Sequence, residues 1–171
     1  MGHLREIVIA DAVVRALKQA GIRARHVHVS DNLDAFRKVP VNLPDSYEQY
    51  LGMPLCMVPS PDDQYDSWAD FCLKPFLDSA DKIGVTMDVV YASDKYRSGF
   101  FVPAIERSLS RIDKAKSAIQ EVSGRQLDDQ WSPIQIMEHG RLKNRQFVRM
   151  DSDAKTITYR SHDDSEHTVR Y

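Results

Sequence analysis

Helical and strand-like patterns alternate along residues 4–122, and this alternation constrains the fold more than any other feature of the sequence. Residues 4–20 and 67–83 carry apolar side chains at helical spacing, and a glycine follows each segment. Residues 22–30 and 85–91 have the β-branched character of short strands. The alternation predicts parallel strands joined by crossover helices, which is an α/β fold.

The sheet of such a fold normally begins with a strand, whereas this chain passes from Met1 almost directly into helical sequence. We therefore expect an incomplete sheet of two or three parallel strands that lacks its opening strand. A half-sheet of this kind leaves an unpaired edge and an uncovered helix face. We expect the chain to self-associate through this exposed half-sheet.

Three further segments and one proline refine the expected fold. Residues 39–63 are rich in proline, tyrosine, leucine and methionine, which predicts an ordered excursion rather than a flexible linker. Pro75 falls inside the second helical segment and should kink or divide it. Residues 93–122 predict one long amphipathic helical region. From Trp131 onwards, short β-prone segments alternate with polar turns and predict a small antiparallel β appendage.

Charge and cysteine content exclude several classes of protein. The 171 residues include 23 Lys and Arg against 25 Asp and Glu, so the chain lacks the positive excess of a protein that coats nucleic acid. Cys56 and Cys72 are too few for a disulfide framework or a four-thiolate zinc site. No apolar run approaches the roughly 18 residues of a membrane span. We expect a soluble, cytoplasmic chain with no membrane partner.

Polar side chains gather just after the first predicted strand. Asp31, Asn32 and Asp34 stand at this point. In open α/β sheets, binding sites lie at the carboxyl ends of the strands. We therefore predict that these three residues line a site, and a solvated turn with a helix cap at Asp31 is the alternative.

Several separated segments resemble those of a known family. Residues 2–6 (GHLRE) and 10–17 (ADAVVRAL) resemble the HIGH-motif helix of class I aminoacyl-tRNA synthetases. Residues 26–40, 50–55, 58–59 and 96–99 match, in the same order, landmarks of the class I lysyl-tRNA synthetases. The resemblance implies a partial Rossmann-like (HUP-type) parallel sheet with flanking helices. It assigns residues 1–125 to the first half of the nucleotide-binding catalytic domain and residues 126–171 to a β subdomain of the connecting insertion.

The resemblance also implies a nucleotide site at the start of the first helix. Gly2 and His3 match the third and fourth positions of the HIGH motif, which holds ATP with Mg²⁺ in the complete enzyme. A glycine lets the nucleotide approach the backbone, and a histidine stabilises charge on the α-phosphate. His3 is therefore the candidate catalytic residue, and an exposed histidine at a frayed terminus is the alternative.

Other parts of the family's catalytic machinery are expected to lie outside this sequence. These are the first HIGH histidine, the loop that lines the amino acid pocket, the second, lysine-containing phosphate loop and the anticodon-binding domain. The resemblance thus implies a portion of a lysine–tRNA ligase, which acts on lysine and tRNA(Lys), and we expect the isolated chain to be inactive. A truncated, non-catalytic relative that serves as a binding or interaction module is the alternative. A stand-alone nucleotidyltransferase is a third reading, and the missing first strand counts against it.

Basic residues alternate with apolar ones near the carboxyl terminus. The basic residues are Arg141, Lys143, Arg145 and Arg149. If residues 141–149 form one strand, these side chains make one basic face suited to a tRNA backbone. A plain solvated strand face is the alternative.

Three histidines are the candidate metal ligands of this part of the chain, and two of them, His139 and His162, lie in the segments where the resembled family often carries cysteine pairs. The third is His167. Because thiolates and closely paired ligands are lacking, we expect no zinc and no other metal site in this chain.

Overall fold

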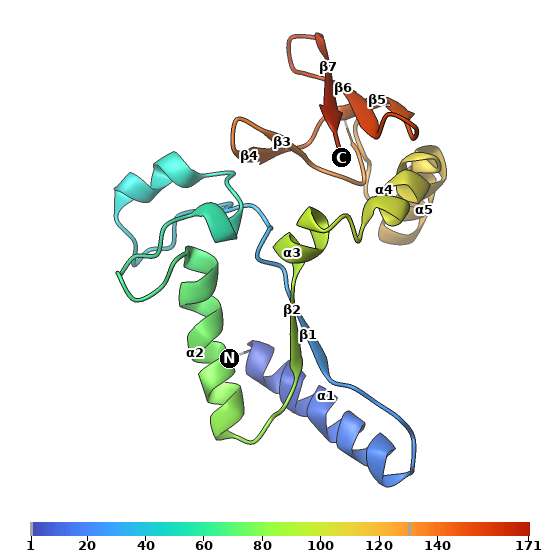
Figure 1. Cartoon of the computed structure of the whole chain (residues 1–171). Coiled ribbons are helices and arrows are strands. Elements are labelled where there is room, and N and C mark those ends of the chain that lie inside the picture. The colour runs from blue at the N-terminus through green and yellow to red at the C-terminus, as the bar shows by residue number, and fades with distance from the viewer. Residues whose placement is uncertain (1, 130) are drawn as a thin grey trace. The chain divides into compact units, whose positions relative to one another are not determined.

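The computed structural model describes residues 2–129 and 131–171, which form two compact units that divide between Lys95 and Tyr96 (Figure 1). The predicted domain boundary between residues 125 and 126 does not coincide with the boundary between these two units. It stays a prediction about the family's domains.

The first unit is built on a parallel pair of strands. Its elements are α1 (Gly2–Gln19), β1 (Val27–Ser30), the 3-10 helices η1 (Asp45–Tyr50) and η2 (Leu55–Met57), α2 (Trp68–Lys82), β2 (Asp88–Tyr91) and the start of α3 (Ala92–Arg97). Strands β1 and β2 run parallel, with Val27 opposite Asp88 and Ser30 opposite Tyr91. This confirms the predicted α/β pattern with a small parallel sheet, although each strand is shorter than expected.

Helix α1 ends where the sequence predicts. Gly21 adopts a φ of +77°, and the amide of Ile22 donates a 2.9 Å hydrogen bond to the carbonyl of Leu17. This left-handed cap satisfies the last carbonyls of the helix, and glycine adopts the required backbone conformation without a steric penalty.

The sequence predicts a kink or a division at Pro75, and the structure shows that the helix is not divided. Helix α2 is continuous from Trp68 to Lys82 with Pro75 inside it. Ser67 caps its first turn by accepting a 3.1 Å hydrogen bond from the amide of Asp70. The loss of one backbone hydrogen bond at Pro75 is offset by this cap and by the apolar packing of α2, which buries Leu73 and Ala80.

Two apolar clusters hold the first unit together. Ile7 of α1, Ala80 of α2 and Val85 form one cluster, against which Phe76 and Met87 pack. The second cluster surrounds three buried residues of the excursion and the segment before it, which are Phe36, Leu43 and Val58. Burying each such side chain contributes about 1.5–3 kcal/mol. The excursion is therefore ordered, as the sequence predicts.

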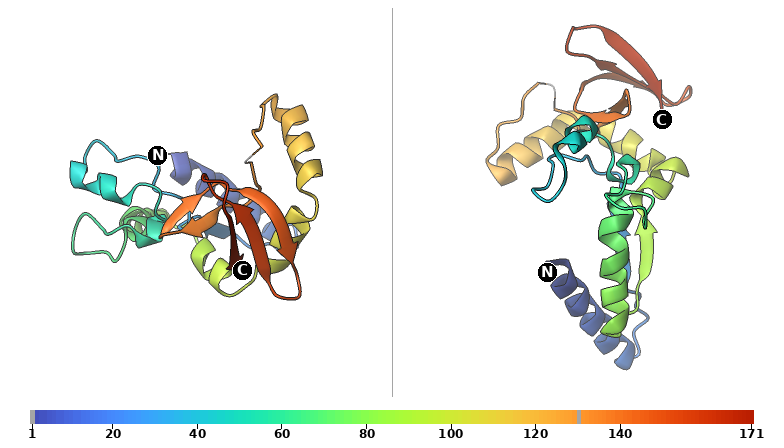
Figure 2. Two further views of the ribbon diagram at one scale, coloured as in Figure 1. Left: turned by 90° about the horizontal axis from the view of Figure 1, so that it is seen from above. Right: turned by 90° about the vertical axis from the view of Figure 1, so that its left-hand side faces the viewer.

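The second unit begins with helices and ends with antiparallel strands. Its elements are α4 (Val102–Leu109), α5 (Ile112–Ser123), β3 (Ile136–Glu138), β4 (Arg141–Lys143), β5 (Gln146–Asp151), β6 (Thr156–Arg160) and β7 (Glu166–Arg170). Strands β3 and β4 form an antiparallel hairpin, and the other three form an antiparallel sheet in the order β5-β6-β7 (Figure 2). This confirms the predicted antiparallel strands.

Residues 93–122 are largely helical, as the sequence predicts, but three helices occupy them instead of one. Gly99 has a φ of +72°, which separates α3 from α4. Pro103 lies in the first turn of α4, where its missing N–H costs nothing, whereas a continuous helix would place it in the interior.

A buried ion pair joins the β3–β4 hairpin to the start of β5. Arg145 is 6% exposed, and its guanidinium donates a hydrogen bond to the carboxylate of Glu138. The Tyr159 hydroxyl donates a 3.3 Å hydrogen bond to the other carboxylate oxygen. The hydrogen bond from Arg145 lowers the pKa of Glu138 below its ordinary value.

Replacing Glu138 by Gln should therefore destabilise the chain by about 3 kcal/mol at pH 7, because a buried cation loses its counter-charge. The pair stabilises the fold above the ordinary glutamate pKa of 4.5, and this contribution is lost as the pH falls through the lowered pKa. Urea unfolding at neutral and acidic pH measures both effects.

The matched control is Glu166→Gln, because Glu166 pairs on the surface with Arg149 at 3.3 Å and with Arg160 at 3.5 Å. This variant should cost about 1 kcal/mol or less. Equal destabilisation by the two variants, or a loss in Glu138→Gln that does not shrink in acid, would contradict the assignment.

Candidate functional site

The start of α1 and the carboxyl end of β1 lie toward the same end of the parallel strand pair. Helix α1 runs away from this end and β1 returns to it (Figures 1 and 2). Gly2 and His3 belong to the first turn of α1, which contains no acidic residue. The amides of such a turn carry partial positive charge and favour an anion. The side chain of His3 lies outside the described residues, so its predicted catalytic role stays a prediction.

Asn32 joins the carboxyl ends of the two parallel strands. Its amide nitrogen donates a 2.9 Å hydrogen bond to the hydroxyl of Ser93, and its amide oxygen accepts a 3.0 Å hydrogen bond from the Ser93 backbone N–H. Both residues are buried, with 8% of Asn32 and 3% of Ser93 exposed. Asn32 therefore positions the backbone around the predicted site.

Asp31 and Asp34 lie on the turn that follows β1. Asp34 accepts hydrogen bonds from the Arg37 guanidinium at 2.7 Å and from the backbone N–H of Ala35 at 2.9 Å. Partial burial raises the pKa of Asp31, and the charge of Asp34 raises it further while Arg37 opposes the rise. Two neighbouring carboxyl groups with one guanidinium give this turn the electrostatic character to attract a cationic group. The chain turns after Asp31 and no helix begins there, so Asp31 is not a helix cap, and its place in a site stays a prediction.

The sequence interpretation missed Ser93, the hydrogen-bond partner of Asn32 beside the predicted site. Ser93 stands two residues after the end of the second strand, just as Asn32 stands two residues after the end of the first. The rule that polar residues at the carboxyl ends of parallel strands mark a site applies equally to both strands. That signal was therefore present in the sequence.

The four basic residues near the carboxyl terminus do not share one strand face. Arg141 and Lys143 lie on β4, Arg149 lies on β5, and Arg145 lies between these strands with its guanidinium buried against Glu138. The expectation of a single basic strand over residues 141–149 is wrong, because the chain leaves β4 before Arg145 and turns that side chain inward. Arg145 is thus unavailable on the surface.

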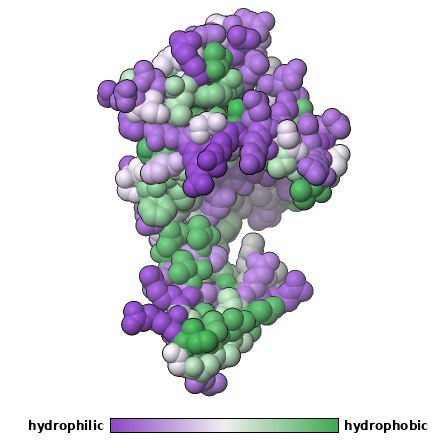
Figure 3. All heavy atoms as spheres, turned by 90° about the vertical axis from the view of Figure 1, so that its right-hand side faces the viewer, coloured by the Kyte–Doolittle hydropathy of each residue, from purple (hydrophilic) through white to green (hydrophobic). Residues whose placement is uncertain are grey.

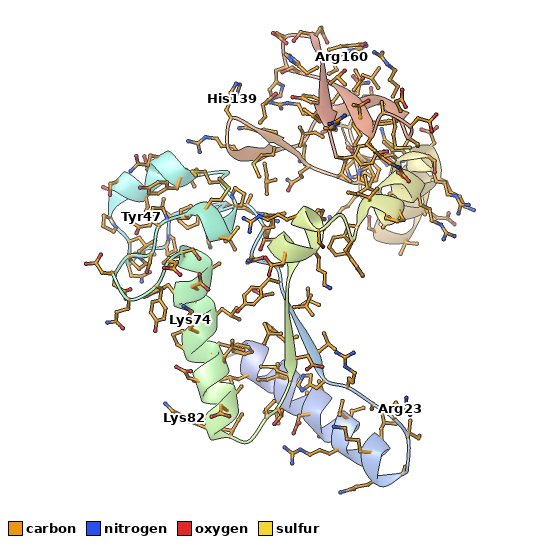
Figure 4. All side chains as sticks on the ribbon, in the orientation of Figure 1. Arg23, Tyr47, Lys74, Lys82, His139 and Arg160 are labelled. Atoms are coloured by element: carbon orange, nitrogen blue, oxygen red, sulfur yellow. The ribbon has the colours of Figure 1, made fainter. Side chains whose placement is uncertain are left out.

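The histidines of the second unit occupy turns and a strand. His139 lies at the tip of the β3–β4 hairpin (Figure 4), where a φ of +48° places it in a tight turn with Gly140. His167 lies 2.8 Å from the Ser165 hydroxyl and stacks on Tyr159. In the part of the chain that the structure describes, no three His, Cys, Asp or Glu side chains are grouped closely enough to hold a metal ion. None of the described helices has the length and apolar character that a membrane crossing requires.

Replacing Asn32 by Ala should destabilise the chain by about 1–3 kcal/mol, because the buried Ser93 N–H and hydroxyl then lose their partner. Thermal or urea unfolding measures this loss. Asn42→Ala is the matched control, because Asn42 is exposed in the excursion. A loss no larger than that of the control would show that the Asn32–Ser93 hydrogen bonds do not hold the strand ends.

Comparisons with known proteins identify the family. The family model described as "tRNA synthetases class I (K)" matches residues 1–171. The chain is 35% identical over 161 residues to lysine–tRNA ligase 1 of Methanosarcina acetivorans, covering 93% of this chain and 30% of that protein. It is 37% identical over 155 residues to the lysine–tRNA ligase of Archaeoglobus fulgidus, covering 90% of this chain and 31% of that protein.

A third relative, the lysine–tRNA ligase of Methanocaldococcus jannaschii, is 33% identical over 162 residues, which cover 94% of this chain and 30% of that protein. The chain therefore spans about three tenths of the length of the relatives it matches. Because the family model matches from the first helix to the last strand, the chain belongs to the class I tRNA synthetase (K) family.

Proposed function

We propose that the chain is a portion of a lysine–tRNA ligase that activates lysine with ATP and transfers it to tRNA(Lys). The observation that carries this proposal is the continuous similarity, over nine tenths of the chain, to ligases of that name. The cytoplasm, where tRNA is charged, is the corresponding location. The fold that accompanies the proposal is a partial Rossmann-like domain over residues 1–125 with a connecting β subdomain over residues 126–171.

The first turn of α1 is where this chain would hold ATP. The turn lacks acidic side chains, so its amides remain suited to the nucleotide phosphates. Gly2 and His3 lie in this turn. ATP with Mg²⁺ would supply the adenylyl group that activates the lysine carboxylate, with pyrophosphate as the leaving group, and Gly2 and His3 would bind and orient the phosphates.

The turn after β1 is where this chain would meet the cationic substrate. Asp31 and Asp34 provide carboxylates there, and the Asn32–Ser93 hydrogen bonds fix the backbone that carries them. An ammonium group of lysine has the complementary charge. Arg141, Lys143 and Arg149 remain candidates for contact with the tRNA backbone.

The isolated chain is expected to lack activity, because catalysis requires groups from several parts of an active site held in one geometry. A binding or interaction module is the alternative function for the chain alone.

A chimaeric enzyme that contains this chain tests the proposal. These 171 residues replace the matching span of the Archaeoglobus ligase, and lysine-dependent ATP–pyrophosphate exchange is measured for the chimaera and for the isolated chain. We expect exchange from the chimaera, its loss on Gly2→Ala together with His3→Ala, and none from the isolated chain.

A chimaera that is folded and binds ATP but does not activate lysine would contradict the ligase proposal and favour the binding module. Exchange by the isolated chain above the level of its Gly2→Ala/His3→Ala variant would contradict the expected inactivity. Unfolding curves for the chimaera distinguish loss of function from loss of fold.

We also propose that the isolated chain self-associates through an apolar face of its first unit. Ile9 and Val13 of α1 are 57% and 52% exposed, on the side of the helix opposite Ile7, which contacts the core. Val29 of β1 is 59% exposed, whereas its neighbour His28 packs against Phe76. Figure 3 shows apolar side chains gathered on this part of the chain.

A second copy of the chain would cover these side chains, because contiguous exposed apolar surface favours association. Sedimentation velocity at about 100 μM should show a dimer or larger species, since such patches associate with micromolar affinity. Ile9→Gln with Val13→Gln should shift the chain toward monomer. Val41→Gln with Val122→Gln, which removes two other exposed valines, is the control. A monodisperse monomer of the unaltered chain would overturn the proposal.

A further inference from the structure

A hollow of about 430 Å³ lies between α4 and α5 in the second unit, and three cationic side chains surround it. These are Arg107 of α4, Arg111 at the junction of the two helices and Lys114 of α5. The remaining lining is mostly small and apolar, contributed by Ala104, Ala115, Ala118 and Pro133. A ligand can therefore approach the helix surface closely while its negative charges meet the cations.

The charges of the three cations are unpaired in the part of the chain that the structure describes. Among the described residues, none of the three makes an ion pair, although each is exposed. The acidic residue of α4, Glu106, is engaged elsewhere, because it accepts hydrogen bonds from Lys155 at 2.7 Å and from the Tyr171 hydroxyl at 2.8 Å. The positive charge around the hollow is therefore available to a partner.

This positive charge is local rather than a property of the whole chain. The complete sequence has a net charge of −2, whereas residues 96–171 contain 13 Lys and Arg against 11 Asp and Glu. Arg107 on α4, Arg111 at the junction and Lys114 on α5 line the same hollow, although they belong to different elements. Three cations around one hollow suit a polymer with repeated negative charges.

We infer that the hollow between α4 and α5 binds the phosphate backbone of an RNA strand through Arg107, Arg111 and Lys114. The inference deepens the proposed function, on which it rests for the choice of RNA as the polyanion. The small apolar floor accommodates ribose, and the cations contact successive phosphates without reading sequence. This surface is separate from the basic residues that the sequence singled out on β4 and β5.

The test measures binding of a fluorescently labelled tRNA(Lys) transcript to the full 171-residue chain by anisotropy, at several potassium chloride concentrations. Arg107→Gln, Arg111→Gln and Lys114→Gln are combined in one variant. The control variant removes the same charge from three exposed cations of the first unit, Lys18, Arg23 and Lys82 (Figure 4 labels the last two).

The hollow variant should bind at least about tenfold more weakly than the unaltered chain at low salt, and the slope of log K against log salt should fall by roughly 2–3. The control variant should change both quantities much less. Circular dichroism and urea unfolding establish that both variants are folded.

Equal weakening by the two variants, an unchanged hollow variant or no RNA binding by the unaltered chain would overturn the inference. Equally effective competition by duplex DNA of the same length would overturn the assignment to RNA. The lysine-dependent exchange of the chimaera requires no RNA, so failure of this inference is distinguishable from failure of the proposed function.

Discussion

The pair of hydrogen bonds between Asn32 and Ser93 is the constraint on which the first unit depends. These residues are 61 positions apart in the sequence, yet each follows one of the two parallel strands. The carbonyl of Asn32 also accepts a 2.9 Å hydrogen bond from the amide of Cys56. One buried side chain and its backbone thus connect β1, the excursion and the start of α3. Because an unsatisfied buried amide is costly, these three segments keep one arrangement.

The surroundings of an arginine decide what it can do. Arg145 is buried with Glu138, so its charge contributes to structure. Arg149 is exposed but lies 3.3 Å from Glu166, which reduces its value to a polyanion. Arg107 lies beside a hollow, without a described carboxylate partner. The sequence alone does not distinguish these three arginines. In the fold, Arg145 has a structural role, Arg149 shares its charge with Glu166, and the charge of Arg107 is available to a partner.

The parallel strands, the ordered excursion and the antiparallel strands were predictable because each follows from local pattern or composition. The continuity of α2 through Pro75 was not, because it depends on a cap at Ser67 and on tertiary packing. Pro103 did carry a local signal, since a proline in the middle of an apparent helix indicates a new first turn. The inward turn of Arg145 was hidden, because its partner Glu138 acts across a hairpin whose position no periodicity reveals. In the candidate site, the acidic turn could be predicted from the sequence. The structural role of Asn32 could not, because it depends on Ser93, which is 61 positions away in the sequence.

The two faces of the small parallel sheet differ in a way that follows from this architecture. His28 meets Phe76 of α2 on one face, while Val27 and Val29 alternate with it and remain exposed on the other. Parallel strands are normally covered on both faces, because crossover helices pack on each side. Strands whose two faces both carry apolar or aromatic side chains are therefore suited to a sheet that is covered on both faces. The described residues cover only the face that carries His28. Covering the other face, where Val27 and Val29 are exposed, would therefore contribute further free energy of burial.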